Sequence, residues 1–262
     1  MSVAPNKALG QHWLHDVDTL RAIVNEANLG PADTVLEIGP GLGTLTDELL
    51  QVSKEVIAVE YDHVLAQKLA KKYKNTAKIT IIEHDILTFN LTKLPKNYVV
   101  VANIPYYLTS KLVRILCEST NPPKRAVLLV QKEVARRIAS KAGDMSILSV
   151  SAQVYNKVTL GVNVKAELFT PPPKVDSQVV VLERREKPLV DLDTLPLFFR
   201  VVKAGFSERR KKLRSSLSGG LILPKDKVDG LLVKSNIGAN ARAQELSIED
   251  WLILVKNFQS IL

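Results

Sequence analysis

The stretch VLEIGPGLGTLT, residues 35–46, decides the fold. Its first half reads as a buried strand that carries Glu37 near its end, and its second half reads as the start of a helix. Between them, Gly39, Gly41 and Gly43 let the backbone turn tightly and approach a ligand with no Cβ in the way. A strand, a glycine-rich loop and a helix in this order predict a nucleotide-cofactor site in a Rossmann-like α/β domain.

The acids near the ends of the predicted strands indicate which cofactor binds. Dinucleotide enzymes prefer G-x-G-x-x-G, with a pyrophosphate at the helix N-terminus. Glu37 would repel a pyrophosphate but suits a ligand with an ammonium and a sulfonium, so the loop favours S-adenosylmethionine over NAD. Glu60 ends the next strand, where it can accept hydrogen bonds from both ribose hydroxyls. Asp85 follows the third strand, where it can accept a hydrogen bond from the adenine amine.

Strand-like apolar runs alternate with segments of helical period through the first two thirds of the chain. This alternation predicts a parallel sheet with helices on both faces, finished by an antiparallel hairpin. The predicted strands are 33–39, 55–60, 78–83, 98–103, 126–131, 157–164 and 177–184, and the predicted helices between them are 44–52, 63–73 and 110–118.

Only segments of helical period follow from about residue 189. We therefore predict a Rossmann-like methyltransferase domain over residues 1–184 and a small all-helical domain over residues 185–262. The predicted helices of the second domain are 194–206, 208–217, 225–235 and 247–258.

Composition narrows the class of protein. No apolar run of the 262 residues approaches the ~20 residues of a membrane span, and the start has no hydrophobic signal segment, so we expect a soluble, cytoplasmic protein with no membrane partner. The single cysteine, Cys117, lies in a helix-like segment and is expected to be a buried structural thiol. The four histidines show no metal-ligand spacing, so we expect no metal site.

Positive charge is concentrated toward the C-terminus. The net charge is +9, and the last 80 residues hold 15 basic and 10 acidic side chains against 21 and 17 in the first 182. The segment ERRKKLRSSL, 208–217, is either a solvated helix face or a contact for the phosphates of a nucleic acid. Its cations are Arg209, Arg210, Lys211, Lys212 and Arg214, set around Leu213 and Leu217.

The run VVVANIPYYLTSKLV, residues 99–113, carries the chemistry. Pro105 cannot extend a strand ladder, so the strand ends at Asn103 and its last side chains project from the sheet edge. The amine of adenine is a poor nucleophile, because its lone pair is delocalised. Asn103 offers an amide oxygen to hold that amine, and Ile104 a carbonyl. Tyr106 offers a flat face on which a base can stack for ~1–3 kcal/mol.

Seven motifs together resemble the ribosomal RNA small subunit adenine N6-dimethyltransferase family over essentially the whole chain. That resemblance implies a Rossmann-like methyltransferase domain with a small helical domain. It also implies methyl transfer from S-adenosylmethionine to two adjacent adenosines near the 3′ end of 16S rRNA, within the 30S subunit or its precursor. We expect the enzyme to be a monomer. The motifs are NKALGQHWLHD, VLEIGPGLGTLT, VANIPYYLTS, LLVQKEVARRI, FTPPPKVDSQVV, AGFSERRKKLRSSL and RAQELSIEDW.

The resemblance also assigns residues. Asn103 and Tyr106 look like the catalytic pair, and Phe169 looks like the aromatic on the other face of the target base. The residues that resemble the family's cofactor contacts are His12, Leu14, Gly39, Glu60, Asp85 and Asn103.

The N-terminal motif departs from the family's common form. That form reads basic-x-Phe-Gly-Gln-Asn-Phe-Leu, and this chain has Leu9, His12 and Trp13 where the family has Phe, Asn and Phe. The change at Leu9 is compatible with packing, whereas His12 alters a cofactor contact.

Three other functions compete with this prediction. The sister group dimethylates one adenine of large-subunit RNA and shares Asn-x-Pro-Tyr, but FTPPPKVDS resembles the small-subunit enzymes more closely. DNA adenine methyltransferases typically show Asp-Pro-Pro-Tyr and need room for a DNA-reading domain. The third is a non-catalytic RNA-binding assembly or transcription factor. The presence of an intact set of catalytic and cofactor residues argues against it: Asn103, Pro105, Tyr106 and Glu60.

Overall fold

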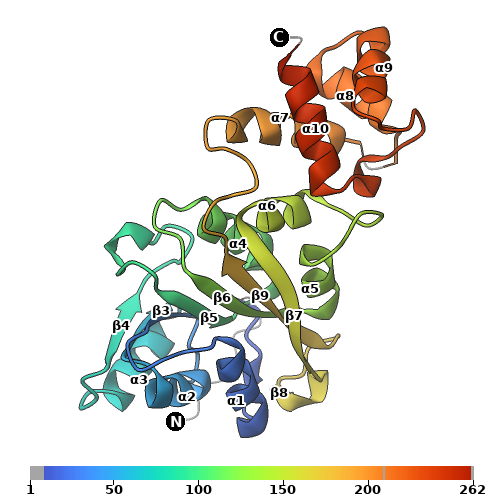
Figure 1. The fold of residues 1–262 in the computed structure, drawn as a ribbon. Helices are drawn as coiled ribbons and strands as arrows, with labels where there is room; N and C mark the ends of the chain where they lie inside the picture. Colours follow the sequence, from blue (N-terminus) through green and yellow to red (C-terminus); the bar gives the residue numbers. More distant parts are fainter. Residues whose placement is uncertain (1–8, 209, 261–262) are drawn as a thin grey trace. The chain divides into compact units, whose positions relative to one another are not determined.

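The computed structural model describes residues 9–208 and 210–260 (Figure 1). The chain divides into two compact units. The first comprises residues up to 136 together with 157–184, and the second comprises 137–156 together with the residues from 185 onward. The segment 137–156 therefore groups with the C-terminal helices, which the sequence pattern does not indicate.

A seven-stranded sheet forms the centre of the first unit, in the order β4-β3-β2-β5-β6-β9-β7. The pairs joining β4, β3, β2, β5 and β6 are parallel, and β9 pairs antiparallel with β6. The order reverses at β2, which has β3 on one side and β5 on the other, so the switch point of the sheet lies at the carboxyl end of β2. The strands are β2 (Thr34–Ile38), β3 (Glu55–Glu60), β4 (Ile79–Glu83), β5 (Val99–Asn103), β6 (Arg125–Gln131), β7 (Asn156–Val164) and β9 (Ser177–Arg184). All seven strands agree with the predicted ranges to within a residue.

Helices of this unit precede, connect or follow the parallel strands. The three predicted helices are confirmed as α2, α3 and α4, whereas α1 and α5 are missing from the sequence prediction. Cys117 lies in α4 and is buried, as expected. The bounds are α1 (Val17–Glu26), α2 (Thr44–Val52), α3 (His63–Lys72), α4 (Thr109–Glu118) and α5 (Lys132–Ile138), with short 3₁₀ helices at Leu91–Lys93, Tyr106–Leu108, Ala166–Leu168 and, in the second unit, Ala243–Glu245.

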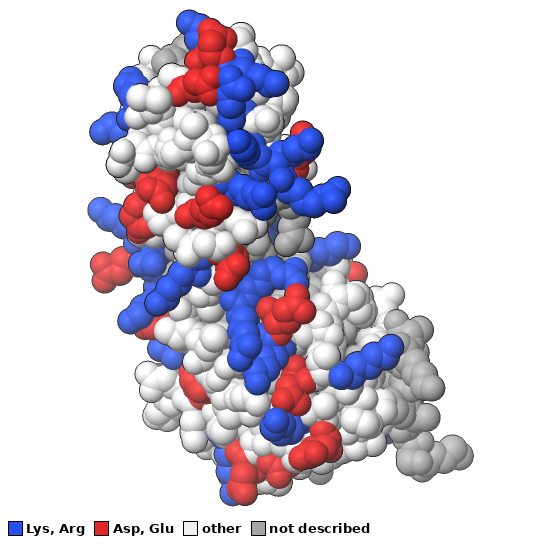
Figure 2. Space-filling view, turned by 90° about the vertical axis from the view of Figure 1, so that its right-hand side faces the viewer, with Lys and Arg blue, Asp and Glu red and all other residues white. Residues whose placement is uncertain are grey.

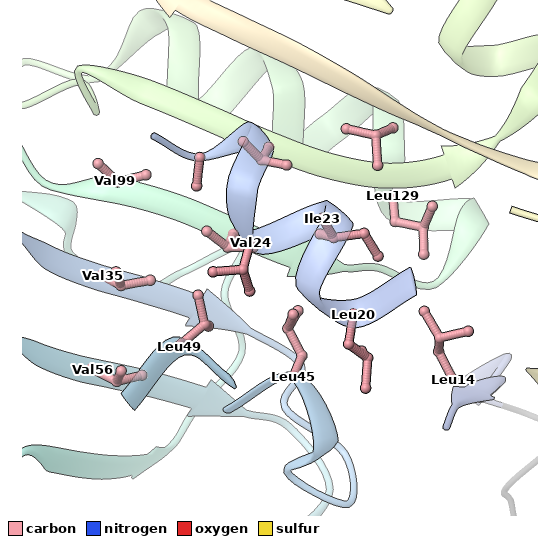
Figure 3. Packing of buried hydrophobic residues seen from close by; sticks show 14 of the residues in the cluster. Leu14, Leu20, Ile23, Val24, Val35, Leu45, Leu49, Val56, Val99 and Leu129 are labelled. Atoms are coloured by element: carbon pink, nitrogen blue, oxygen red, sulfur yellow. The ribbon is translucent and has the colours of Figure 1, made fainter. Parts of the chain in front are cut away.

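One hydrophobic cluster joins the sheet to α1 and α2 (Figure 3). Branched side chains of β2, β3 and β5 point from the sheet toward leucines and isoleucine of the two helices. Burying such a side chain contributes ~1.5–3 kcal/mol, so this layer fixes the helix that follows the glycine loop against the sheet. The labelled members are Leu14, Leu20, Ile23, Val24, Val35, Leu45, Leu49, Val56, Val99 and Leu129.

A second, two-stranded sheet joins distant parts of the chain. β1 (Trp13–Leu14) pairs antiparallel with β8 (Phe169–Thr170), with Trp13 opposite Thr170 and Leu14 opposite Phe169. This sheet has no counterpart among the predicted elements, because two residues are too few to show a period.

Helices make up the second unit, and three of them pack closely against one another. A Cβ at Gly205 of α7 would lie 2.4 Å from the ring of Trp251 in α10, and one at Gly220 of α8 would lie 2.6 Å from the Cβ of Ala204 in α7. These glycines therefore let three helices approach. The bounds are α6 (Ile147–Tyr155), α7 (Leu195–Gly205), α8 (Leu213–Leu221), α9 (Lys225–Lys234) and α10 (Ile248–Gln259).

The prediction that the basic segment forms a helix from residue 208 is wrong. α8 begins at Leu213, and Lys212 before it has extended backbone angles. Successive cations repel each other, and cations also oppose the positive end of a helix dipole, so a helix starts more readily after them. Leu213 and Leu217 are both buried, as a shared helix face requires.

None of the helices within residues 9–208 and 210–260 has both the length and the apolar composition that a membrane span requires.

Candidate active site

A pocket of about 350 Å³ lies in the first unit at the carboxyl ends of β2, β3 and β5. It brings together most of the residues predicted for cofactor binding and catalysis. Gly43 and Phe169 are not among the residues that line it. The predicted residues that do line it are His12, Leu14, Glu37, Gly39, Gly41, Glu60, Asp85, Asn103, Ile104, Pro105 and Tyr106.

The glycine loop has the backbone that its sequence predicts. Gly39, Gly41 and Gly43 have φ values of +68°, +60° and +77°, a region that other residues rarely adopt. A Cβ at Gly43 would lie 2.5 Å from the Tyr73 hydroxyl, which donates to the Gly43 carbonyl at 2.9 Å. Gly43 therefore shapes the turn into α2, while Gly39 and Gly41 present bare backbone to the pocket.

Glu60, at the end of β3, holds the glycine loop. Its Oε2 accepts from the Gly41 N–H at 3.0 Å and its Oε1 from the Asp62 N–H at 2.9 Å. Burial raises the pKa of this carboxyl, although the two hydrogen bonds act to lower it. Each carboxylate oxygen has a second lone pair, so the side chain can still accept hydrogen bonds from a ligand.

Glu37 is almost completely buried within β2. Thr46 Oγ1 donates to its Oε2 at 2.6 Å, and no described residue bonds its buried Oε1. Burial, with smaller contributions from the charges of Glu60 and Asp47, raises the pKa of Glu37 to about 8. The carboxyl is therefore mainly protonated near neutral pH, which the sequence does not predict.

This raised pKa predicts a pH-dependent stability. Between the ordinary pKa of 4.5 and about 8, the folded chain holds a proton that the unfolded chain releases, so the free energy of unfolding should fall as pH rises through this window. Glu37→Gln removes the titration. From pH 6 to 7.5, urea unfolding should show the wild type losing about 2 kcal/mol relative to Glu37→Gln. Parallel curves for the two proteins would contradict the assignment.

Asn103 lies at the end of β5, as predicted, and its amide is oriented. Nδ2 donates to the His12 carbonyl at 3.2 Å. Because Nδ2 is engaged in this way, Oδ1 is the side-chain acceptor available to a ligand, and no described residue donates to it.

Tyr106 follows in a 3₁₀ turn and is fixed by β9. Its hydroxyl hydrogen-bonds Ser177 Oγ at 2.8 Å, and burial raises its pKa, so the phenol is neutral. The His12 ring stacks on the Tyr106 ring with centroids 5.9 Å apart and an interplanar angle of 21°. Tyr106 is therefore a rigid aromatic surface in the pocket.

Residues 12–14 form a strap across the pocket. His12 Nδ1 donates to the Pro171 carbonyl at 2.7 Å, Thr44 Oγ1 donates to the Leu14 carbonyl at 2.9 Å, and β8 pairs with β1. Beside this strap, an ideal Cβ on Gly41 would lie 3.3 Å from the Trp13 ring. From the sequence, Trp13 is only a departure from a motif, and its place over the glycine loop is a finding of the structure.

Aromatic residues also form the rim of the pocket. Tyr61 and Tyr107 line it while remaining 63% and 61% exposed. Partial burial, with smaller contributions from Asp85 and Tyr61, raises the pKa of Tyr107. Asp85 Oδ1 accepts from the Leu87 N–H at 2.9 Å. Neither rim tyrosine is among the predicted site residues, although each directly follows one.

Comparison with known proteins decides the family. A family model described as ribosomal RNA adenine dimethylase matches residues 3–260. The chain belongs to this family. It is therefore a methyltransferase of the class that uses S-adenosylmethionine, as the glycine loop and its neighbouring acid predicted.

Curated relatives of this adenine dimethylase carry a more specific name. Two of these relatives, one from Dehalococcoides mccartyi and one from Bacillus cytotoxicus, are named ribosomal RNA small subunit methyltransferase A. The first is 40% identical over 248 residues, 94% of this chain and 85% of the relative. The second is 38% identical over 260 residues, 95% of this chain and 89% of the relative.

Solved structures confirm the predicted fold class of the adenine dimethylase. A dimethyladenosine transferase from Plasmodium falciparum matches with a TM-score of 0.82 at 29% identity, covering 95% of this chain and 98% of that one. The 23S rRNA methyltransferase ErmE matches with a TM-score of 0.76 at 30% identity, covering 94% and 99%. Both matches span the Rossmann-like sheet and the C-terminal helices.

Phe169 is not among the residues that line the pocket of the adenine dimethylase. It is 3% exposed, pairs with Leu14 in the small sheet and belongs to the hydrophobic cluster. In this arrangement its ring supports the strap, and its predicted contact with a target base stays a prediction.

The cations of the basic segment differ in how they are held. Arg209 lies outside the described residues. Arg214 makes a two-pronged ion pair with Asp229, with both N–O distances 2.5 Å, and Lys212 Nζ donates to Asn240 Oδ1 at 2.6 Å. Arg210 and Lys211 are exposed. Figure 2 shows contiguous areas of Lys and Arg side chains on the face that it draws, with Asp and Glu among them.

Proposed function

We propose that the chain transfers methyl groups from S-adenosylmethionine to N6 of two adjacent adenosines near the 3′ end of 16S rRNA in the small ribosomal subunit or its precursor, giving N6,N6-dimethyladenosine. The observation that carries the proposal is Asn103, at the end of β5, which lines the pocket beside the glycine loop and has its Nδ2 engaged by the His12 carbonyl. The small-subunit name of relatives at about 40% identity supports the choice of RNA. We expect the enzyme to act as a monomer in the cytoplasm.

The hydrogen-bonding groups of the pocket match those of S-adenosylmethionine. Glu60 offers lone pairs to the ribose hydroxyls, and Asp85, which lines the same pocket, is the proposed acceptor for the adenine amine. The buried and unpartnered Glu37 Oε1 suits an ammonium donor, whose positive charge favours the ionised carboxylate over the protonated form. His12, Leu14, Gly39 and Gly41 complete the proposed seat. When bound there, the cofactor supplies an electrophilic methyl group on a sulfonium.

The chain's own residues prepare the nucleophile. We assign Asn103 Oδ1 and the Ile104 carbonyl as acceptors for the N6 hydrogens, which favours a pyramidal nitrogen whose lone pair can attack. Pro105 ends the strand so that this carbonyl can leave the ladder. Tyr106, held by Ser177, provides the stacking face for an adenosine drawn out of its own stack.

Exposed cations of the second unit are the proposed RNA contact, because one adenine pocket cannot select one site in a ribosome. Changing Arg210 and Lys211 to Gln should weaken binding to small subunits and leave the affinity for S-adenosylmethionine unchanged. The slope of log affinity against log salt should flatten by ~0.7–0.9 for each phosphate that is no longer neutralised. Filter binding across a salt series measures the affinity for small subunits and its dependence on salt.

A matched control removes the same charge elsewhere in the second unit. Lys225 and Lys227 are exposed on α9, and changing both to Gln should leave the salt slope near that of the wild type. If the two double variants behave alike, the segment before α8 is an ordinary solvated surface. Arg209, Lys212 and Arg214 are predicted to contribute to the same contact, although the ion pair of Arg214 with Asp229 must open for it to reach a phosphate.

A large-subunit substrate is the second candidate, because ErmE matches over nearly the whole chain. Labelled methyl transfer to 30S subunits and to protein-free 23S rRNA tests both candidates. We expect label in the 30S RNA, four methyl groups per subunit at completion. Label in 23S rRNA alone would favour the second candidate, and label in neither would favour a non-catalytic role.

A further inference from the structure

Two buried polar atoms, on side chains of residues that line the pocket, have no hydrogen-bond partner among the described residues. They are Trp13 Nε1, a donor, and Glu37 Oε1, an acceptor when the carboxyl is ionised. Buried polar groups in proteins are nearly always hydrogen-bonded, so an unpaired one that faces a ligand site indicates a partner supplied by the ligand. One atom of each kind indicates a ligand that brings both an acceptor and a donor.

Trp13 is held in place by its neighbours on the strap. Its backbone pairs with Thr170, the His12 carbonyl before it accepts from Asn103, and the Leu14 carbonyl after it accepts from Thr44. The indole edge lies over the glycine loop, where an ideal Cβ on Gly41 would be 3.4 Å from Nε1. The absence of a side chain at Gly41 therefore leaves room beside the indole N–H.

The amino-acid end of the proposed cofactor has the matching groups. It carries an ammonium, which only donates, and a carboxylate, which only accepts. An indole N–H only donates, so it can bind the carboxylate and not the ammonium, while Glu37 Oε1 is left for the ammonium. The N-terminus of α2, which begins after Gly43, adds a positive dipole end that favours an anion nearby.

We propose that Trp13 is a positioning residue whose indole Nε1–H donates a hydrogen bond to the α-carboxylate of S-adenosylmethionine. This inference rests on the proposed cofactor seat. It gives the tryptophan a role that phenylalanine, common at this position in the motif, cannot perform, because phenylalanine has no donor.

The test compares S-adenosylmethionine with its decarboxylated form by calorimetry. Trp13→Phe keeps an aromatic ring and removes the donor. It should weaken binding of S-adenosylmethionine by about 10- to 150-fold, the range for one hydrogen bond to a charged group, and change binding of the decarboxylated form by less than about twofold. Trp251→Phe is the matched control, because Trp251 Nε1 is also buried and unpartnered but lies outside the pocket. It should change neither affinity.

If Trp13→Phe weakened the binding of both ligands equally, the proposal would be overturned, because Trp13 would then have a packing role alone. Unchanged binding of both ligands would overturn it as well. If the wild type bound neither ligand, the cofactor seat itself would fail, which is a distinguishable result. If Trp13→Phe does not fold, Trp251→Phe leaves Trp13 as the one tryptophan of the two in the chain. Its fluorescence should then shift more with S-adenosylmethionine than with the decarboxylated form, and identical spectra would overturn the proposal.

Discussion

Replacing Asn103 by alanine should slow methyl transfer by about 100- to 1,000-fold under single-turnover conditions, the usual effect of removing one oriented group that acts mainly in the transition state. The amide is oriented by its bond to the His12 carbonyl, and its oxygen is the acceptor proposed for the N6 amine. This bond strengthens as the nitrogen becomes pyramidal and cationic, so RNA affinity should change by less than about twofold.

Asn257→Ala is a suitable control for this measurement. Asn257 also donates through Nδ2 to a backbone carbonyl, that of Lys234, but it lies on α10 and does not line the pocket. It should transfer methyl groups at the wild-type rate. Equal rates for Asn103→Ala and the wild type would refute the catalytic assignment, and a loss confined to RNA affinity would make Asn103 a binding residue instead.

Replacing Glu60 by alanine should weaken S-adenosylmethionine binding by about 30- to 1,000-fold, because it removes an acceptor for two hydroxyls at ~1.5–3 kcal/mol each, less recovered solvation. The same change releases the Gly41 N–H, so part of the loss comes from a looser glycine loop. Calorimetry gives the affinity, and urea unfolding shows whether the fold is intact.

Glu60→Gln separates the two contributions. Glutamine keeps the shape and one acceptor oxygen, which can still hold the backbone N–H of Gly41 or of Asp62 but not both. Its affinity should fall between those of the wild type and alanine. A folded Glu60→Ala protein with wild-type affinity would show that the ribose binds elsewhere.

The sheet and most of the pocket could be predicted because their signals are local. A strand buried on both faces reads as a continuous apolar run, and the glycine loop and Asn-x-Pro-Tyr are turn chemistry written in consecutive residues. Glu60 and Asn103 follow from the rule that parallel strands deliver their carboxyl ends to one edge.

The parts that could not be predicted depend on distant contacts. β1 and β8 are two residues each, and the pairing of Trp13 with Thr170 has no trace in the sequence near either residue. The start of α8 at Leu213 does not follow from the helical spacing of Leu213 and Leu217, because the cations before Leu213 show no pattern that marks a helix start. The raised pKa of Glu37 arises from complete burial, which the identity of the residue does not show.

The strap explains how this chain departs from the common N-terminal motif and still keeps two main-chain anchors. Asn103 and Thr44 both bond main-chain carbonyls of the strap, those of His12 and Leu14, and every amino acid supplies such a carbonyl. Evolutionary substitution at positions 12 and 13 therefore leaves the anchoring intact as long as the backbone path is kept. The side chains there can then make other contacts, and in this chain they are an imidazole and an indole in place of the amide and the phenyl ring of the common motif.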